Sequence, residues 1–204
     1  MNNKYKTQQE KFWKGDFGKE YISRNKLVNK FKFIGKNLIN NKVNIKSAIE
    51  LGSNIGLNLD TIKRIYPKIK TFGIEINDSA FNILKKKHLA SNSSILEFST
   101  KEKFDLVITC LVLIHQNPKT LNEIYEKMYE LTKKYIYIAE YFNPTPVTIT
   151  YRGYKNKLFK RDFAKEIWNK YPKLRLINYG FHWSEDPSFK KNTCDNETWF
   201  LFQK

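Results

Sequence analysis

The 204-residue chain has few cysteines and no long apolar run, and both shortages exclude classes of protein. Its two cysteines, Cys110 and Cys194, belong to no CxxC or CxxH pair, so we expect neither a disulfide framework nor a metal cluster. No run of about 18 apolar residues could span a membrane. The first residues also lack the apolar core of a secretory signal. These absences predict a cytoplasmic protein without a membrane span and without a metal ion.

Arginine is scarce too, and this bears on the strong positive charge. The formal net charge is +17, from 37 Lys+Arg against 20 Asp+Glu, but only five of the basic residues are arginine. Proteins that read bases and phosphates favour arginine because its planar fork makes bidentate contacts. The lysines are instead spread from Lys4 to Lys204. We therefore interpret most of the charge as a solvated surface and do not expect a nucleic-acid partner.

The apolar residues that are present alternate in a way typical of α/β proteins. They make up 41% of the chain, enough for one packed domain of this length. Residues 7–40 have helical spacing, and later segments alternate between short apolar runs and amphipathic helices. We expect strands at 48–51, 71–76, 94–98, 104–109, 135–141, 175–183 and 198–202, and helices at 57–66, 79–89, 119–132 and 161–171. This order predicts a Rossmann-like, doubly wound, mainly parallel seven-stranded sheet in residues 45–204, with an N-terminal helical cap in residues 1–44.

The turn after the first strand has the spacing Glu50-x-Gly52-x-Asn54-x-Gly56. Gly52 allows the backbone to turn sharply near a ligand, and Gly56 allows close packing at the start of the next helix. A dinucleotide site would show G-x-G-x-x-G, whereas here an acid precedes the first glycine. That carboxylate would repel a pyrophosphate and suits a cation. The spacing therefore favours S-adenosylmethionine, with its amino and sulfonium groups, over a nicotinamide dinucleotide.

Two further segments complete the predicted cofactor site. Glu75 ends the second strand 19 residues after Gly56, where an acid can accept hydrogen bonds from both ribose hydroxyls of an adenosine. Charge-assisted bonds of this kind contribute roughly 1.5–3 kcal/mol each. Ile76 follows it, and we assign the adenine edge to Phe98 and Ser99 beyond the third strand.

These residues resemble the motifs of class I S-adenosylmethionine-dependent methyltransferases, and residues 104–107 and 112–115 resemble that family's fourth strand and the turn after it. Segments 7–18, 140–147, 151–153 and 157–164 resemble the pseudaminic acid biosynthesis-associated methylase family, a likeness that extends over essentially the whole chain. The resemblance implies a class I methyltransferase fold and S-adenosylmethionine as cofactor, with S-adenosylhomocysteine as product. It also implies a cytoplasmic enzyme encoded beside those that make nine-carbon nonulosonic acid sugars.

The predicted reaction edge lies beyond the carboxyl ends of the strands, where open parallel sheets bind ligands. There the fourth strand ends at Cys110, which we place near the cofactor, and His115 follows. A neutral imidazole can remove a proton from a hydroxyl or ammonium acceptor, so His115 is the candidate base. Its alternative role is to cap the helix that begins near Pro118. Tyr141 and Asn143, after the fifth strand, are expected to point at the acceptor.

A sixteen-residue stretch, 143–158, is predicted to be a functional loop. It contains Tyr151 and Arg152, and Lys160 and Arg161 follow it. A guanidinium there can bind a carboxylate or phosphate bidentately, although Arg152 could equally be a solvated loop charge. In the cap, Trp13 and Arg24 are candidate contacts to the cofactor, and the alternative for Trp13 is helix packing.

The leading hypothesis is a methyltransferase that acts on a small acidic sugar or sugar nucleotide of nonulosonic acid biosynthesis. Two alternatives stay open: an RNA or protein methyltransferase that docks through the positive charge, and a non-catalytic adenosyl-binding partner of a sugar-pathway enzyme. His88 and His182 are expected to be structural, and the oligomeric state is left unpredicted.

Overall fold

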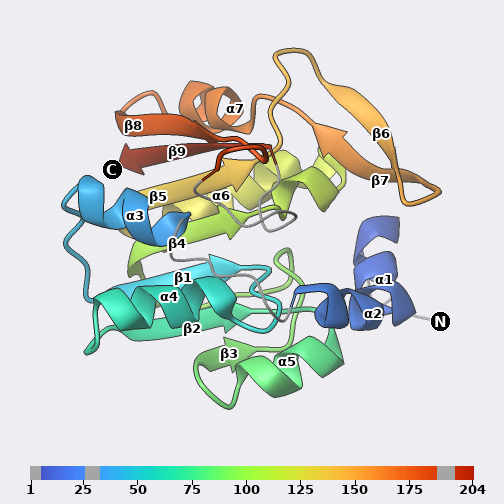
Figure 1. The fold of residues 1–204 in the computed structure, drawn as a ribbon, viewed down its shortest axis with the longest axis horizontal. Coiled ribbons are helices and arrows are strands. Elements are labelled where there is room, and N and C mark those ends of the chain that lie inside the picture. Colours follow the sequence, from blue (N-terminus) through green and yellow to red (C-terminus); the bar gives the residue numbers. More distant parts are fainter. Residues whose placement is uncertain (1–5, 26–32, 188–195) are drawn as a thin grey trace. The chain divides into compact units, whose positions relative to one another are not determined.

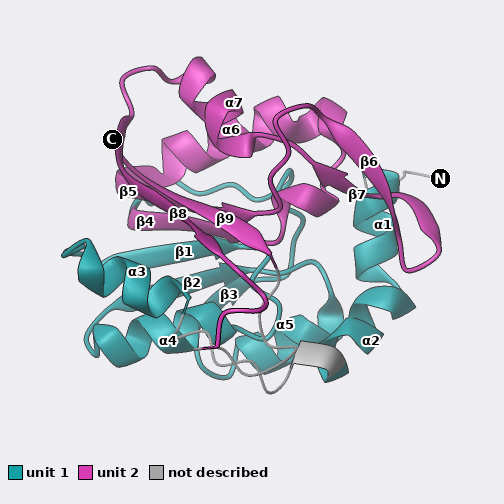
Figure 2. Cartoon of the chain, turned by 45° about the horizontal axis from the view of Figure 1, so that its top comes forward, with its two compact units in different colours: residues 1–104 teal, residues 105–204 magenta. Residues whose placement is uncertain are grey.

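The computed structural model describes residues 6–25, 33–187 and 196–204, apart from the side chains of Arg24 and Asn25 (Figure 1). The chain groups into two compact units, residues 1–104 and 105–204 (Figure 2). The division into a cap of residues 1–44 and a domain of residues 45–204 stays a prediction. No helix within the described ranges is long and apolar enough to cross a membrane.

Seven strands form one sheet in the order β3-β2-β1-β4-β5-β9-β8. The strands are β1 (Ser47–Leu51), β2 (Lys70–Ile74), β3 (Leu89–Ser91), β4 (Phe104–Cys110), β5 (Thr132–Glu140), β8 (Arg175–His182) and β9 (Glu197–Gln203). In the first unit β2 is parallel to both β1 and β3, and in the second unit β9 is antiparallel to both β5 and β8. The predicted α/β class and mainly parallel seven-stranded sheet are confirmed.

The first unit contains five described helices: α1 (Gln8–Lys14), α2 (Asp16–Asn25), α3 (Ile34–Asn40), α4 (Leu57–Ile65) and α5 (Asp78–Leu84). Helix α1 begins with a capping box, in which the Thr7 side chain accepts from the Glu10 N–H and the Glu10 carboxylate accepts from the Thr7 N–H at 2.7 Å. This local signal explains why the predicted helical N-terminus forms. The helical spacing predicted for residues 7–40 also covers residues 26–32, which lie outside the described residues.

The core of the first unit lies between α4 and the sheet. All five residues of β1 are buried, and Leu59 and Ile62 of α4 are fully buried. Gly56 is the N-cap of α4 and has φ +87°. A Cβ at this position would lie 2.9 Å from side-chain atoms of both His88 and Leu84. The close packing predicted for Gly56 is therefore present. His88 bonds Thr71 at 2.9 Å and Asp60 at 3.2 Å, which gives this histidine a structural role.

The second unit surrounds β4 and β5 with short helices and a hairpin. Its remaining elements are the 3-10 turns η2 (Leu113–His115) and η3 (Pro118–Thr120), the helices α6 (Leu121–Leu131) and α7 (Phe163–Lys170), and the hairpin strands β6 (Val147–Tyr151) and β7 (Tyr154–Lys160). Helix α6 buries the expected stripe, since Leu121, Ile124, Met128 and Leu131 all lie in the core. In β8, His182 bonds Glu197 of β9 at 2.9 Å, also a structural contact.

Two predicted elements are wrong. The third strand was expected at 94–98, but β3 is Leu89–Ser91, and 94–98 is a turn closed by a Phe98 N–H bond to the Ser94 carbonyl. Ile95 and Leu96 are apolar because this turn is buried. The predicted loop at 143–158 is largely the hairpin β6–β7. Its two-residue turn, Arg152-Gly153, has φ +50° and +84°, the backbone that hairpin turns require.

Candidate functional site

The glycine-bearing loop joins the end of β1 to the start of α4. Its backbone has positive φ at Gly52 (+72°), Asn54 (+49°) and Gly56 (+87°), conformations that glycine and asparagine adopt most easily. The Gly52 and Ser53 N–H groups both donate to the Ile74 carbonyl at 2.9 Å. The loop is thus fixed to the end of β2, and the ligand-binding role predicted from the spacing Glu50-x-Gly52-x-Asn54-x-Gly56 stays a prediction.

Glu50 is the buried acid of this loop, with 1% of its surface exposed. Its Oε1 accepts a hydrogen bond from Asn58 Nδ2 at 2.6 Å. Within the described part of the chain, the Oδ1 atoms of Asn54 and Asn58 are buried and receive no hydrogen bond. Leaving such an acceptor unsatisfied costs about 1–3 kcal/mol. The arrangement therefore suits a ligand group that donates hydrogen bonds and carries positive charge.

Asn58 was missed by the sequence analysis. The available signal was its place in the first turn of α4, eight residues after Glu50, on the side of the helix that packs against the sheet. An asparagine at a buried helical position needs a polar partner, and Glu50 is that partner.

Glu75 follows β2 and connects its end to the glycine loop. Its Oε2 accepts from the Asn54 N–H and its Oε1 from the Asn77 N–H, both at 2.7 Å. Burial raises the pKa of the Glu75 carboxyl, while the N–H bonds from Asn77 and Asn54 oppose that rise. A carboxylate has about four lone-pair sites, so these bonds leave acceptor capacity on both oxygens. The predicted ribose contact of Glu75 has this geometry in its favour and stays a prediction.

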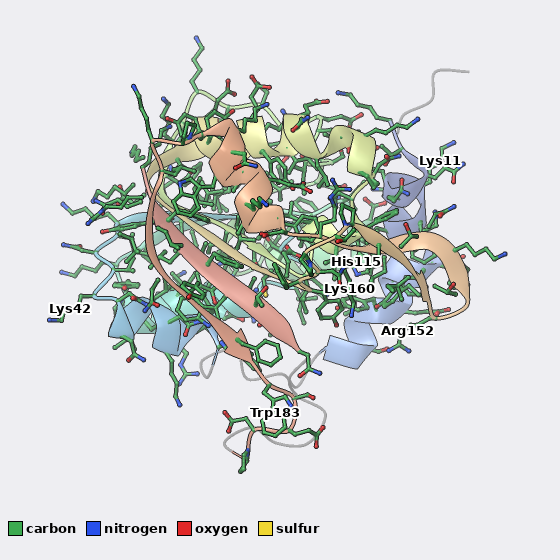
Figure 3. All side chains as sticks on the ribbon, turned by 90° about the horizontal axis from the view of Figure 1, so that it is seen from above. Lys11, Lys42, His115, Arg152, Lys160 and Trp183 are labelled. Carbon is green, nitrogen blue, oxygen red and sulfur yellow. The ribbon has the colours of Figure 1, made fainter. Side chains whose placement is uncertain are left out.

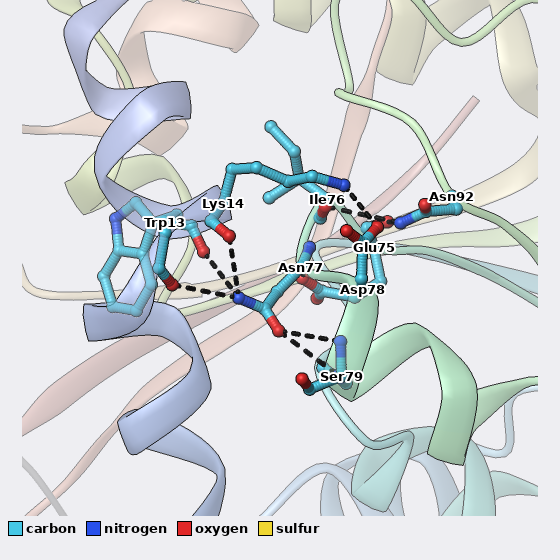
Figure 4. A network of polar contacts seen from close by, with 10 residues as sticks. Trp13, Lys14, Glu75, Ile76, Asn77, Asp78, Ser79 and Asn92 are labelled. Carbon is cyan, nitrogen blue, oxygen red and sulfur yellow. Dashed lines mark hydrogen bonds and ion pairs between the residues drawn. The ribbon is translucent and has the colours of Figure 1, made fainter.

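Asn77 connects three elements of the first unit (Figure 4). Its Oδ1 accepts from the N–H groups of Ser79 and Ala80 at the start of α5. Its Nδ2 lies 3.1–3.3 Å from the carbonyl oxygens of Trp13, Lys14 and Gly15, which end α1. One side chain therefore satisfies the N-terminus of one helix and the C-terminus of another, while its backbone N–H holds Glu75.

Lys14 and Trp13, at the end of α1, also make side-chain contacts within the first unit. Lys14 forms an ion pair with Asp78, the first residue of α5. The Trp13 ring makes edge contacts with Phe17 and Tyr21, at centroid distances of 5.3 and 5.2 Å. Phe17 and Tyr21 belong to α2, so the cofactor contact of Trp13 and its alternative, helix packing against the domain, both stay predictions. The predicted contact from Arg24 lies outside the described side chains.

The three remaining first-unit candidates differ in exposure. Phe98 is buried, with its ring 5.5 Å from that of Phe72, whereas Ser99 is exposed and Ile76 is half-buried. Asn92 Nδ2 donates to the Glu75 carbonyl at 3.0 Å and so fixes the chain beside Ile76. The adenine assignments to Phe98 and Ser99 remain predictions.

His115, the candidate base, belongs to the second unit. It is buried, and its Nδ1 lies 2.6 Å from the Lys157 carbonyl oxygen of β7. Because a carbonyl only accepts, Nδ1 carries the proton and Nε2 carries the basic lone pair. Burial lowers the pKa of the imidazole to about 4, and the bond to Lys157 opposes this. The Tyr151 ring lies 4.9 Å from the imidazole.

The turn that carries His115 is held by Glu140, the last residue of β5. Glu140 Oε1 accepts from the N–H groups of Val112 and Leu113 at 3.1 and 3.0 Å, and Oε2 accepts from that of Ile114 at 3.3 Å. Burial raises the pKa of the Glu140 carboxyl to about 8, against these three bonds. Cys110, before this turn, is half-buried.

Two of the acceptor residues predicted in the second unit, Arg152 and Lys160, are labelled in Figure 3. Arg152 is exposed at the hairpin turn, with its guanidinium carbon 5.9 Å from the Tyr151 ring centre. Lys160 Nζ lies 5.3 Å from the Tyr141 ring centre, so these two candidates are neighbours.

Arg161 and Asn143 make internal contacts. Arg161 Nε donates to Glu166 Oε1 at 2.7 Å, and the other oxygen of Glu166 accepts from the Tyr125 hydroxyl. Asn143 Nδ2 donates to the Thr145 carbonyl, and its N–H bonds the Arg161 carbonyl at 3.4 Å. Roles in acceptor binding for these two side chains stay predictions. Across residues 6–25, 33–187 and 196–204, no group of three or more His, Cys, Asp or Glu could hold a metal ion.

No protein-family model and no curated protein matches the chain. Solved structures do share its fold. A magnesium protoporphyrin IX methyltransferase from Synechocystis PCC 6803 with bound SAH is 11% identical with a TM-score of 0.67, covering 96% of this chain and 97% of that chain. An S-adenosylmethionine-dependent methyltransferase from Archaeoglobus fulgidus is 15% identical with a TM-score of 0.65 (93% and 100% covered), and another from Clostridium acetobutylicum ATCC 824 is 12% identical with a TM-score of 0.62 (92% and 97% covered). The chain therefore has the class I methyltransferase fold.

Proposed function

We propose that this protein is an S-adenosylmethionine-dependent methyltransferase that releases S-adenosylhomocysteine. The observation that carries the proposal is the glycine loop of the first unit, in which Glu50, Asn58 and Glu75 converge. Solved proteins with the same fold include methyltransferases with bound SAM or SAH, which supports the same cofactor here.

The residues present fit this cofactor. The Glu50 carboxylate and the buried Oδ1 atoms of Asn54 and Asn58 would hold its ammonium group, and Glu75 would accept from its ribose hydroxyls. When bound, S-adenosylmethionine supplies an electrophilic methyl group on a sulfonium. The chain then has to fix the orientation of the donor and exclude water from it, because methyl displacement needs little covalent help from the protein.

His115 is the proposed base for the acceptor. Its Nδ1–H bond to the Lys157 carbonyl fixes the tautomer in which Nε2 can take a proton from a hydroxyl or ammonium group. Since burial keeps its pKa near 4, the imidazole is neutral throughout the physiological range. Tyr141 belongs to the same proposal as a residue that orients the acceptor.

The proposed acceptor is a small acidic sugar or sugar nucleotide of the nonulosonic, pseudaminic-type class, methylated in the cytoplasm. Arg152 and Lys160 support an anionic acceptor, because both lie beside a tyrosine ring that can pack on a sugar face. An RNA or protein acceptor is the second candidate, favoured by the exposed cations and aromatic ring of the hairpin, Arg152, Tyr154 and Lys155.

Transfer of a labelled methyl group tests the acceptor. Wild-type protein would be incubated with labelled S-adenosylmethionine and either nonulosonic acids, their CMP-linked forms, total RNA or a mixture of proteins. We expect label in the acidic sugars or their nucleotides. Label in RNA or protein alone would overturn the sugar proposal. No label in any acceptor, from a protein that binds the cofactor, would favour a non-catalytic adenosyl-binding partner of a sugar-pathway enzyme.

A further inference from the structure

Glu140 has an unusual combination of burial and hydrogen bonding. Its side chain is 2% exposed at the end of β5, and both carboxyl oxygens accept from consecutive backbone N–H groups, those of Val112, Leu113 and Ile114. These N–H groups open the η2 turn and have no partner within such a short turn. The carboxyl oxygens of Glu140 accept from them as a capping side chain would, although Glu140 lies 26–28 residues away in the chain.

The turn held in this way is the one that carries His115. The His115 N–H donates to the Val112 carbonyl at 3.0 Å, so the imidazole follows directly from the N–H groups that Glu140 binds. On the other side, Nδ1 is bonded to the Lys157 carbonyl of β7. The position of the imidazole is therefore set on one side by a turn that Glu140 of β5 binds and on the other by a backbone carbonyl of β7. Leu111, just before the turn, has φ +55°, a strained backbone that needs such external support.

We propose that Glu140 is a positioning residue for the base His115: it holds the turn Val112–His115 so that the imidazole keeps its tautomer and its orientation toward the acceptor. This inference rests on the proposed function, in which His115 removes the proton of the acceptor. Glu140 touches neither acceptor nor cofactor in this role. Loss of its carboxyl group would misplace the imidazole without altering Glu50 and Glu75, the groups proposed to hold the cofactor.

Two variants of Glu140 and one matched control test the inference. Glu140→Gln keeps the size of the side chain but turns an NH2 group toward at least one of the three N–H donors. Glu140→Asp keeps the carboxyl group but is too short to reach all three N–H donors. Glu197→Gln is the control: Glu197 is an equally buried acid on the neighbouring strand β9 whose charge also raises the pKa of Glu140, but it bonds His182 and makes none of the three bonds to the turn.

Kinetics, cofactor binding and NMR together distinguish a misplaced His115 imidazole from a general loss of protein stability. In Glu140→Gln we expect kcat to fall about 10- to 100-fold, with KM and the Kd for S-adenosylhomocysteine within about twofold of wild type. We expect Glu140→Asp to lose less. NMR of the His115 ring nitrogens should show the Nδ1–H tautomer in wild type and in Glu197→Gln, and a mixture of tautomers in Glu140→Gln.

Unchanged kcat and an unchanged His115 tautomer in both folded Glu140 variants would overturn the inference. So would an equal loss of kcat in Glu197→Gln, because that would reflect general destabilisation. If Glu140→Gln does not fold, Glu140→Asp decides by the same readouts. Absence of S-adenosylhomocysteine binding by wild type would instead refute the proposed function, and the NMR comparison would still decide whether Glu140 positions His115.

Discussion

At the scale of single residues, the burial of His115 predicts how stability depends on pH, and the contacts of Asn58 predict how tightly the cofactor product binds. His115 is buried as a neutral imidazole whose pKa is lowered from 6.5 to about 4. The unfolded chain therefore binds a proton below pH 6.5 that the folded chain accepts only near pH 4. Stability contributed by neutral His115 is fully present above pH 6.5 and is lost as the pH falls toward 4.

We predict that His115→Gln flattens the dependence of stability on pH in this window. For the wild type, the lowered pKa corresponds to a loss of up to about 3 kcal/mol in the free energy of unfolding between pH 6.5 and 4. Urea denaturation of both proteins at several pH values between 4 and 6.5 measures this loss in the free energy of unfolding. Parallel curves for the two proteins would show that His115 titrates normally in the fold.

Asn58 gives a second prediction at this scale. Asn58→Ala removes the amide that orients Glu50 and one buried acceptor, so S-adenosylhomocysteine should bind about 10-fold more weakly, a loss of about 1.4 kcal/mol. Calorimetric titration measures the change. Asn82→Ala, an exposed asparagine of α5, is the control and should bind as wild type does. Equal affinity for wild type and Asn58→Ala would remove Asn58 from the cofactor site.

At the scale of elements, Asn77 links α1 to α5 through its two amide atoms. We predict that Asn77→Ala lowers the free energy of unfolding by about 1–2 kcal/mol, because an N-cap and the cap of the α1 carbonyls are both lost. It should also speed amide exchange in residues 8–14. Asn117→Ala, which removes only the cap of η3, should leave exchange in α1 unchanged. Equal exchange in α1 for both variants would contradict the link.

The hairpin β6–β7 is the element that carries the proposed anion contact. Arg152→Ala should raise KM for an acidic acceptor about 10-fold while the affinity for S-adenosylhomocysteine stays constant. Lys155→Ala removes another exposed cation of the same hairpin and serves as the control. Steady-state kinetics with each variant checks this. Equal weakening of acceptor and cofactor binding by Arg152→Ala would argue against a clamp.

The elements also show where sequence patterns are informative. The helices α4 and α6 follow from apolar spacing, since their periodic residues are buried, and β1 follows from a short run whose five residues are all buried. The hairpin was predicted as a loop because two prolines precede it and a glycine lies within it. Yet Val147, Ile149 and Tyr151 alternate with threonines, and Arg152-Gly153 supplies the turn. That alternation was the signal for β6, and the turn residues were the signal for a hairpin.

Long-range polar partners were harder to predict than elements. Glu50 and Glu75 stood out because the spacing of the glycine loop gave them a context. Glu140 binds N–H groups 26–28 residues away, and Asn77 reaches carbonyls 62–64 residues away. Neither pairing leaves a local pattern, because an acid or an asparagine after a strand is equally compatible with a solvated surface.

At the scale of the whole molecule, the net charge of +17 gives few strong contacts. Lys70–Glu102 and Lys87–Asp60, both at 2.7 Å, join partly exposed side chains, and such pairs contribute about 0–1 kcal/mol each. The buried polar side chains, by contrast, include the candidate site residues Glu50, Asn58, Glu75, His115 and Glu140. The proposed function therefore depends on these buried groups rather than on the total charge.

Binding of S-adenosylhomocysteine is the most direct test of the central claim, that the glycine loop and Glu75 form a cofactor site. Calorimetry would compare wild type, Glu75→Ala and the control Glu102→Ala, which removes an exposed acid of the same unit. We predict micromolar binding by wild type and Glu102→Ala, and at least about 10-fold weaker binding by folded Glu75→Ala. No binding by wild type below millimolar concentration, or unchanged binding by Glu75→Ala, would contradict the account.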